Sequence, residues 1–309
     1  MVARRARTLF GTSLGWSLGL ALSAGIVAVV VLELCASPVL GATPTPPSMQ
    51  PGGGGAVQRI DDYGAATEAA KATGAMLLVS VEPTTGNPND IAGSRLERAD
   101  LQQRFAASGV PWVFCRIGID AGGSALVADP GLTEMRRGPG VFVVDHTAGP
   151  YAGRIVSILP RTSGKYYSFS PAHIDELASL PPASLTQRSL ILAVRIHPEN
   201  PQSTSGTCDP SLCAAAEEHS QHQASIRRQG HHGWDSRSQR IAAGRGGAAE
   251  VCAESWPDQD LLDSCVDCVA SWRQSSGHWN AVRSPQAAYG YDLRRGTNGI
   301  WYATGIFVK

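Results

Sequence analysis

The sequence predicts a mixed α/β chain of 309 residues with two folded regions. Between residues 59 and 181, short apolar runs typical of buried strands alternate with segments of helical periodicity. Residues 208–309 carry further helical segments and end in two alternating strands around an Asn-Gly turn. Residues 182–207, rich in Pro and Ser, have the composition of a connector. The chain is also long for a single domain, which favours two.

The charge balance argues against a nucleic-acid partner. Lys plus Arg and Asp plus Glu both total 26, so the formal net charge is zero. Nucleic-acid-binding domains typically carry a basic surplus, and this chain has none. Hydrophobic residues make up 43% of the chain, which is sufficient for ordinary buried cores.

Residues 1–42 have the pattern of a signal peptide or signal anchor. Three arginines near the N-terminus precede an uncharged stretch from Leu14 to Leu32, which at about 1.5 Å per residue nearly spans a bilayer core. Val39-Leu40-Gly41 before Ala42 would serve as a cleavage site. The segment is therefore either cleaved or retained as a transmembrane anchor. In both cases we expect export to a periplasmic or extracellular location, and a retained helix would anchor the protein to the cytoplasmic membrane.

Residues 43–58 are Pro-rich and Gly-rich and predict a flexible linker. The elements expected after it are helices at 62–74, 94–108 and 171–180 and strands at 75–83, 110–120, 138–149 and 151–161. We expect Gly74 to cap the first helix and Thr147-Ala148-Gly149 to turn between the last two strands.

This order of elements resembles the thioredoxin fold over residues 59–181. Gly138-Pro139 precedes a strand at the position where thioredoxins place a cis-proline. Where thioredoxins carry Cys-x-x-Cys after the first central strand, residues 82–90 here read EPTTGNPND. The resemblance therefore implies a thioredoxin-like domain without disulfide-exchange chemistry at that position. Cys115, inside an expected strand, is interpreted as a small buried hydrophobe.

The connector contains one apolar stretch, and the second region contains most of the cysteines. Residues 188–196 predict a strand or a covering segment. In an exported chain, a cysteine cluster favours disulfides, and the odd number leaves one thiol free or bonded to another chain. The candidates for disulfides are Cys208, Cys213, Cys252, Cys265 and Cys268. The Cys-x-x-Cys at 265–268 also fits a redox pair or two metal ligands.

In the second region, helical periodicity predicts helices at 211–229 and 260–275, the latter stopped by Gly277. Residues 289–308 predict a β-hairpin that turns at Gly296-Thr297-Asn298-Gly299. We interpret most of the tryptophans and tyrosines of this region as core, although such side chains also line glycan or lipid grooves.

An ordered set of motifs in this region resembles the CAP superfamily of cysteine-rich secretory, antigen five and pathogenesis-related proteins. The motifs are His-x-Gly-Trp, Ala-Glu-Val-Cys-Ala-Glu, Trp-Arg-x-Ser-x-Gly-His-Trp and a Tyr-Gly-Tyr before the final WYATGIF strand. The resemblance covers residues 205–309. It implies an α-β-α sandwich with a cleft of two histidines and two acidic residues, in which the histidines of several members bind a divalent metal.

By position, the resemblance assigns the cleft to His232, with His231 as the alternative, and to Glu250 and His278. The second acidic position falls on Ser275, so three of four positions are filled. His232 and His278 would be the metal ligands, for Zn²⁺ or another divalent cation. Two imidazoles and a carboxylate suit zinc, with a fourth position left to water.

These features favour a binding or scaffold role at the cell envelope, with a glycan, lipid or protein ligand. The alternative is a metal-dependent hydrolase that acts on an envelope polymer or peptide through metal-activated water. The missing acidic residue removes the natural base, although Glu254 is nearby in sequence, so a binding role is favoured over an enzyme. A thiol-redox role at Cys265 and Cys268 is a third class. A purely structural arrangement, with His278 packed between tryptophans and Glu250 bonded to the backbone or Arg237, also remains open.

Overall fold

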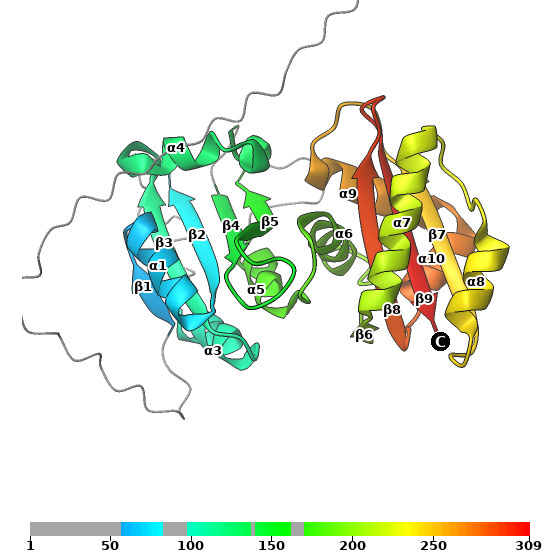
Figure 1. Cartoon of the computed structure of the whole chain (residues 1–309), viewed down its shortest axis with the longest axis horizontal. Coiled ribbons are helices and arrows are strands. Elements are labelled where there is room, and N and C mark those ends of the chain that lie inside the picture. The colour runs from blue at the N-terminus through cyan, green and yellow to red at the C-terminus, as the bar shows by residue number, and fades with distance from the viewer. Residues whose placement is uncertain (1–56, 83–97, 137–139, 162–169) are drawn as a thin grey trace, which may run out of the picture. The chain divides into compact units, whose positions relative to one another are not determined.

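The computed structural model describes residues 57–82, 98–136, 140–161 and 170–309. These residues form a mixed α/β fold with two sheets, which confirms the predicted fold class (Figure 1). The predicted targeting segment, most of the predicted linker, Gly138-Pro139 and almost all of residues 82–90 lie outside the described residues. Within the described part, no helix is long and apolar enough to cross a bilayer.

The first sheet has five strands in the order β1-β3-β2-β4-β5. Its strands are β1 (Gln58–Ile60), β2 (Met76–Glu82), β3 (Trp112–Gly118), β4 (Gly140–Asp145) and β5 (Arg154–Pro160). The strands β1, β2 and β3 run parallel, whereas β4 is antiparallel to both of its neighbours. Every residue of β2 and β4 is buried, as expected for central strands covered on both faces.

The helices predicted in this region are present. The helix α1 (Tyr63–Thr73) begins where Asp62 accepts a hydrogen bond from the Ala65 N–H at 2.7 Å, and it ends at Gly74, whose φ of 59° is left-handed. The remaining helical segments are η1 (Ile119–Gly123), η2 (Pro130–Arg136), α3 (Ala99–Ala107), α4 (Ser124–Val127) and α5 (Pro171–Ser179). Cys115 is fully buried in β3, as predicted, and burial is the main reason that its pKa rises to about 11.

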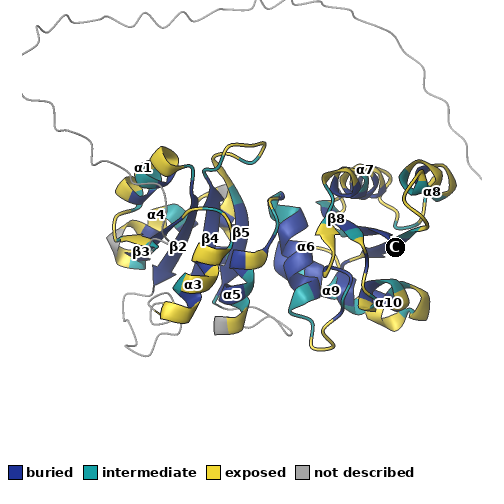
Figure 2. Ribbon diagram, turned by 90° about the horizontal axis from the view of Figure 1, so that it is seen from below, coloured by how far each residue is buried: buried dark blue, intermediate teal, exposed yellow. Residues whose placement is uncertain are grey.

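The apolar stretch of the connector is a helix, α6 (Leu185–Arg195), rather than a strand. Ser184 and Gln187 form a capping box at its start, which supplies hydrogen-bond partners for the first backbone N–H groups. Helix α6 contacts β5, β8 and α9, and residues 187–194 are all buried (Figure 2). Even Arg188 is buried, and its Nε donates to Ser157 Oγ at 2.8 Å.

The second sheet has four strands in the order β6-β8-β9-β7. Its strands are β6 (Thr207–Cys208), β7 (Ala248–Glu254), β8 (Ala288–Arg295) and β9 (Trp301–Val308). Strand β6 is parallel to β8, and the other pairs are antiparallel. The hairpin of β8 and β9 turns at 296–299, where Gly299 has a φ of 78°, and the predicted hairpin is therefore confirmed.

Helices cover both faces of this sheet. The helices α7 (Pro210–Ile226) and α8 (Trp234–Ala242) lie on one face, and α9 (Leu261–Gln274) and α10 (Ser276–Arg283) lie on the other (Figure 2). The expected stop at Gly277 is wrong. Helix α9 ends at Gln274, Ser275 has an extended backbone between the two helices, and Gly277 lies inside α10. The residues Trp272, Tyr289, Tyr291 and Tyr302 are fully buried core, whereas Trp256 is 73% exposed.

Candidate functional site

Three of the residues assigned from the CAP resemblance meet beside strand β7. His231 Nδ1 lies 3.0 Å from Glu250 Oε1, and His231 Nε2 lies 3.3 Å from His278 Nε2. Glu250 comes from the middle of β7, His231 from the segment before α8, and His278 from α10. The histidine pair lies at the surface, whereas the Glu250 side chain is completely buried.

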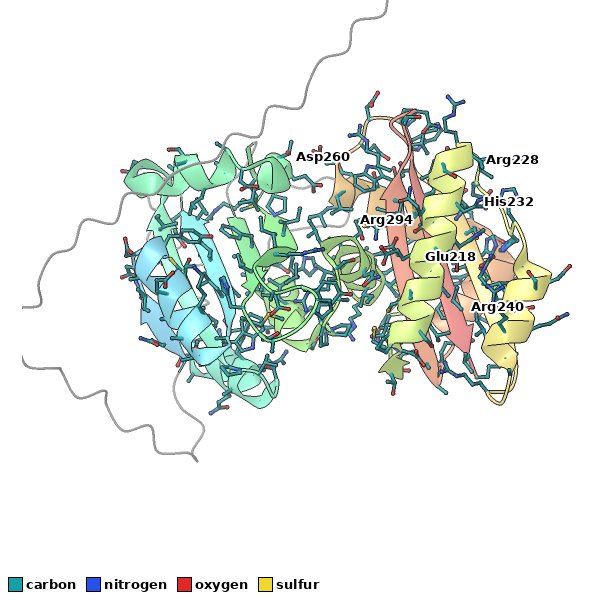
Figure 3. The ribbon with its side chains drawn as sticks, viewed as in Figure 1. Glu218, Arg228, His232, Arg240, Asp260 and Arg294 are labelled. Atoms are coloured by element: carbon teal, nitrogen blue, oxygen red, sulfur yellow. The ribbon has the colours of Figure 1, made fainter. Side chains whose placement is uncertain are left out.

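The structure brings His231 into this group, and not His232, which was the first assignment. The His232 ring instead lies 5.8 Å from that of His222 and 6.4 Å from that of His219. These three histidines line a pocket of about 470 Å³ between α7 and α8, together with residues such as Glu218 and Arg240 (Figure 3). Adjacent residues in an irregular segment point in different directions, which explains why one histidine joins Glu250 and its neighbour does not.

Glu250 is ionised in this environment. Burial is the largest single influence and raises its pKa, but hydrogen bonds from His231 and Arg237 and the nearby charges of His219 and Arg237 together outweigh it, so the pKa of the carboxyl lies below its ordinary value. Arg237 donates to Glu250 Oε2 from Nε at 3.0 Å and also from Nη2. An ionised carboxylate only accepts hydrogen bonds, so His231 donates its Nδ1–H to Oε1. Nε2, on the side of His278, is therefore the ring nitrogen of His231 that can offer a lone pair.

His278 contributes the second imidazole. Its pKa lies below the ordinary value, first because the ring is partly buried and second because His231 is close. A neutral imidazole is the form of histidine that binds metals. The 3.3 Å contact between the two Nε2 atoms is a hydrogen bond, so one of these nitrogens carries a proton that a metal bound by both would displace.

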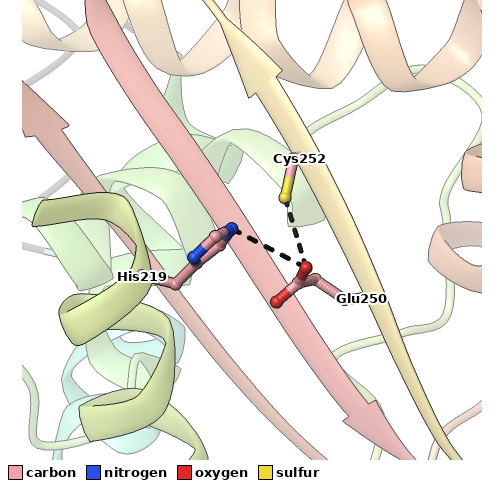
Figure 4. Close-up of side chains that lie close together, drawn as sticks. All are labelled: His219, Glu250 and Cys252. Carbon is pink, nitrogen blue, oxygen red and sulfur yellow. Dashed lines mark hydrogen bonds and ion pairs between the residues drawn. The ribbon is translucent and has the colours of Figure 1, made fainter. Parts of the chain in front are cut away.

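A second group of possible ligands lies deeper in the same region. His219, Glu250 and Cys252 are all buried, their ligand atoms lie within 4.8 Å of one another, and the group could hold a metal ion (Figure 4). Cys252 Sγ lies 3.6 Å from Glu250 Oε1, and His219 Nε2 lies 3.7 Å from the same oxygen.

Two of the possible ligand atoms in this deeper group carry protons, which makes the group less suited to binding a metal. His219 Nε2 lies 2.9 Å from the carbonyl oxygen of Gly230, which can only accept, so that nitrogen carries a proton. Burial and the charge of Glu250 raise the pKa of the Cys252 thiol well above its ordinary value. A metal would have to displace both protons, whereas at the His231–His278 pair it would have to displace only the one proton shared by the two Nε2 atoms.

His219, Cys252 and Arg237 were not among the predicted cleft residues. The period-two alternation of strand β7 was a usable signal for Cys252, because it places this residue on the same face as Glu250. Arg237 had been named as one possible partner of Glu250, and it is one. Nothing in the sequence indicates that His219, on the buried face of α7, reaches the strand.

The cysteine framework differs from the expectation. Within the described residues the structure contains no disulfide, and the sulfurs of Cys208 and Cys213 lie 3.4 Å apart. Cys265 and Cys268 are buried in α9, against one face of the second sheet. Strand alternation directs Cys252 to the other face, so the sheet separates it from that helix.

Comparison of the chain with known proteins gives no matching family model and no matching curated protein.

Proposed function

We propose that the chain is an exported cell-envelope protein with a binding role, and that His231 and His278 hold a divalent metal ion at its binding site. One observation carries the proposal: the two Nε2 atoms lie 3.3 Å apart at the surface. The proposed ligand is an envelope glycan, lipid or protein.

The spacing of the nitrogens fits the proposed metal. Two imidazole nitrogens that bind one tetrahedral zinc ion at 2.0–2.1 Å are separated by roughly 3.3 Å. The hydrogen bond of the His231 Nδ1–H to Glu250 leaves Nε2, on the side of His278, as the ligand atom of this ring. A carboxylate behind a metal-bound histidine fixes the ring and raises its basicity.

Two protein ligands leave positions that other groups can fill. When bound, the ion would act as a Lewis acid toward an oxygen ligand. His231 is 42% exposed on its side chain, so such a ligand can approach from solvent. Oxygen atoms of a glycan, a lipid headgroup or a partner's carboxylate have the required chemistry.

Hydrolysis receives less support than binding. A hydrolase of this type needs a base that accepts a proton from water. Glu250 is held ionised by Arg237, and both of its oxygens are already engaged. Ser275, at the other acidic position of the resemblance, has no basic group. The site is therefore suited to holding a ligand rather than to cleaving it.

The architecture supports the two resemblances as part of this proposal. The strand order β1-β3-β2-β4-β5 with an antiparallel β4 is compatible with a thioredoxin-like domain. Two helical layers around the second sheet are compatible with the α-β-α sandwich of CAP proteins. Export and membrane attachment rest on the sequence of residues 1–42 alone.

The metal site is tested by titrating the purified full chain with Zn²⁺ in a calorimeter and by measuring bound metal by mass spectrometry. We expect one ion per chain. Because outer partners alone account for roughly 10–100-fold in affinity, removing a direct ligand in His231→Ala or His278→Ala should weaken binding by more than about 100-fold.

Two control variants separate this pair from its neighbours. His232→Ala changes the adjacent histidine and should leave zinc binding unchanged. Cys252→Ser removes a ligand of the buried group and should also leave it unchanged. Zinc lost in Cys252→Ser but kept in His278→Ala would assign the ion to the buried group. Turnover of a peptide or envelope polymer that is lost with His278→Ala would establish hydrolysis instead of binding.

A further inference from the structure

Cys208 and Cys213 form a close pair of thiols at the start of helix α7. Their sulfurs lie 3.4 Å apart. Cys208 ends the short strand β6, and Cys213 lies in the first turns of α7.

The fold holds the two cysteines together from both sides. Cys208 pairs with Tyr289 of β8, and the Cys213 N–H donates to the carbonyl of Asp209 at 2.9 Å. Helix α7 crosses β8 at Gly290, where any Cβ would overlap the backbone of Leu212 and Cys213. The absence of a side chain at Gly290 therefore permits the approach that brings Cys213 to Cys208.

The remaining gap is small. A disulfide bond measures about 2.05 Å, so the two sulfurs need to approach by roughly 1.4 Å. Cys208 belongs to a two-residue edge strand, which is paired on one side only. Rotation of its side chain with a slight shift of this edge can supply that movement.

The two thiols differ in access and in acidity. Cys208 is partly exposed, whereas Cys213 is 6% exposed. A hydrogen bond from Cys213 is the main reason that the pKa of Cys208 is lowered, and Arg195 acts in the same direction while burial opposes it. The same hydrogen bond and burial raise the pKa of Cys213. A thiolate is the reactive form of cysteine, so Cys208 is the thiol that attacks.

We propose that Cys208 and Cys213 form a thiol–disulfide exchange site whose reaction partner is an organic disulfide. The Cys208 thiolate attacks one sulfur of that disulfide, releases the other sulfur as a thiolate and forms a mixed disulfide. Cys213 then loses its proton and attacks Cys208 Sγ, which releases the second thiolate. The partner disulfide is reduced to two thiols, and the two cysteines are oxidised to one disulfide.

The short loop favours exchange over a fixed bridge. The bond would close only the residues from Cys208 to Cys213, and the stabilisation gained from a disulfide grows with loop length. A bridge that stabilises the fold only slightly is more easily reduced. This site is independent of the metal proposal, because none of its residues belongs to the histidine group.

The test uses the full chain and glutathione as the probe. The protein is equilibrated at a series of ratios of reduced to oxidised glutathione, quenched with acid and alkylated, and its cysteine peptides are read by mass spectrometry. We expect a Cys208–Cys213 disulfide whose occupancy follows the ratio, and alkylation of Cys208 at least roughly tenfold faster than that of Cys213. Cys265 and Cys268 in the same digest should stay unmodified, because they are fully buried.

Three variants complete the experiment. Cys213→Ser should accumulate a glutathione adduct on Cys208, and Cys208→Ser should accumulate none on Cys213. Cys115→Ala, in the first sheet, is the control and should leave the exchange unchanged. The proposal is overturned if the bond never forms, if Cys208 pairs with another cysteine, or if the bond persists at every ratio as a fixed bridge. The wild-type measurement alone decides between these outcomes if a variant does not fold.

Discussion

The buried ion pair of Glu250 and Arg237 offers the sharpest test of the site, through the variant Arg237→Met. The Glu250 side chain is fully buried and that of Arg237 is 9% exposed, so methionine would leave a carboxylate without its main partner. Removing one member of a buried pair costs about 3–5 kcal/mol of the free energy of unfolding. His231 remains 3.0 Å from Glu250 and can take up a proton, so we expect the lower end, about 3 kcal/mol.

The assay is chemical denaturation of the full chain at pH 7.5 and at pH 4. The folded state lowers the pKa of Glu250, so its ion pairs contribute stability above the ordinary pKa, and this contribution is lost as the pH falls through the folded value. In the variant, Glu250 can be protonated at pH 4 and no longer carries an unpaired charge. The loss of stability should therefore be largest at pH 7.5 and smaller at pH 4.

Two controls decide whether the ion pair is responsible. Arg240→Met alters an exposed arginine of the same helix and should change stability by less than about 0.5 kcal/mol. The double variant Arg237→Met/Glu250→Met removes both charges and should recover most of the loss, because well-packed apolar replacements of a buried pair are often neutral. An equal loss at both pH values, or no recovery in the double variant, would refute the reasoning.

Three further predictions concern stability. Glu134 accepts hydrogen bonds from the Leu261 and Leu262 N–H groups, and burial raises its pKa to about 7 from 4.5. Stability should fall as pH rises from 4.5 to 7, by up to about 3 kcal/mol, and Glu134→Gln should abolish this slope in denaturation curves. Gly290→Ala should cost about 2–3 kcal/mol by the same assay, because its Cβ would overlap the backbone of α7. Trp256→Ala should change stability by less than about 0.5 kcal/mol, since the ring is 73% exposed. A wild-type stability that does not change between pH 4.5 and 7 would contradict the first prediction. Unchanged stability of Gly290→Ala would contradict the second, and a clear loss of stability in Trp256→Ala would contradict the third.

Much of the fold follows from periodicity in the sequence. Unbroken apolar runs marked β2 and β4, and the Asn-Gly turn marked the hairpin of β8 and β9. Helix α6 was missed because a short apolar run does not distinguish a buried helix from a buried strand. The signal that could have separated them is the capping box of Ser184 and Gln187, three residues apart at the start of the run.

The candidate site was predictable only where regular structure determines direction. Glu250 lies on a strand, so alternation along β7 determines which face of the sheet its side chain is on, and residues on both faces of this strand are buried. His231 and His232 lie in an irregular segment before Gly233, whose left-handed φ of 69° turns the chain into α8. Side chains in such a segment follow no regular periodicity. The sequence therefore does not indicate which of the two histidine rings reaches Glu250.

The role of Glu250 joins the stability of the fold to the chemistry of the site. One of its oxygens neutralises Arg237, and the other fixes the proton of His231 on Nδ1. A glutamine at this position could still accept from His231, but it would leave the buried guanidinium without a counter-charge. Glu250→Gln should therefore lower stability and zinc affinity together. His278 contacts neither oxygen, so His278→Ala should lower zinc affinity alone. Because one carboxylate both balances a buried arginine and orients His231, the proposed ligand nitrogen is held in place at no further cost in buried charge.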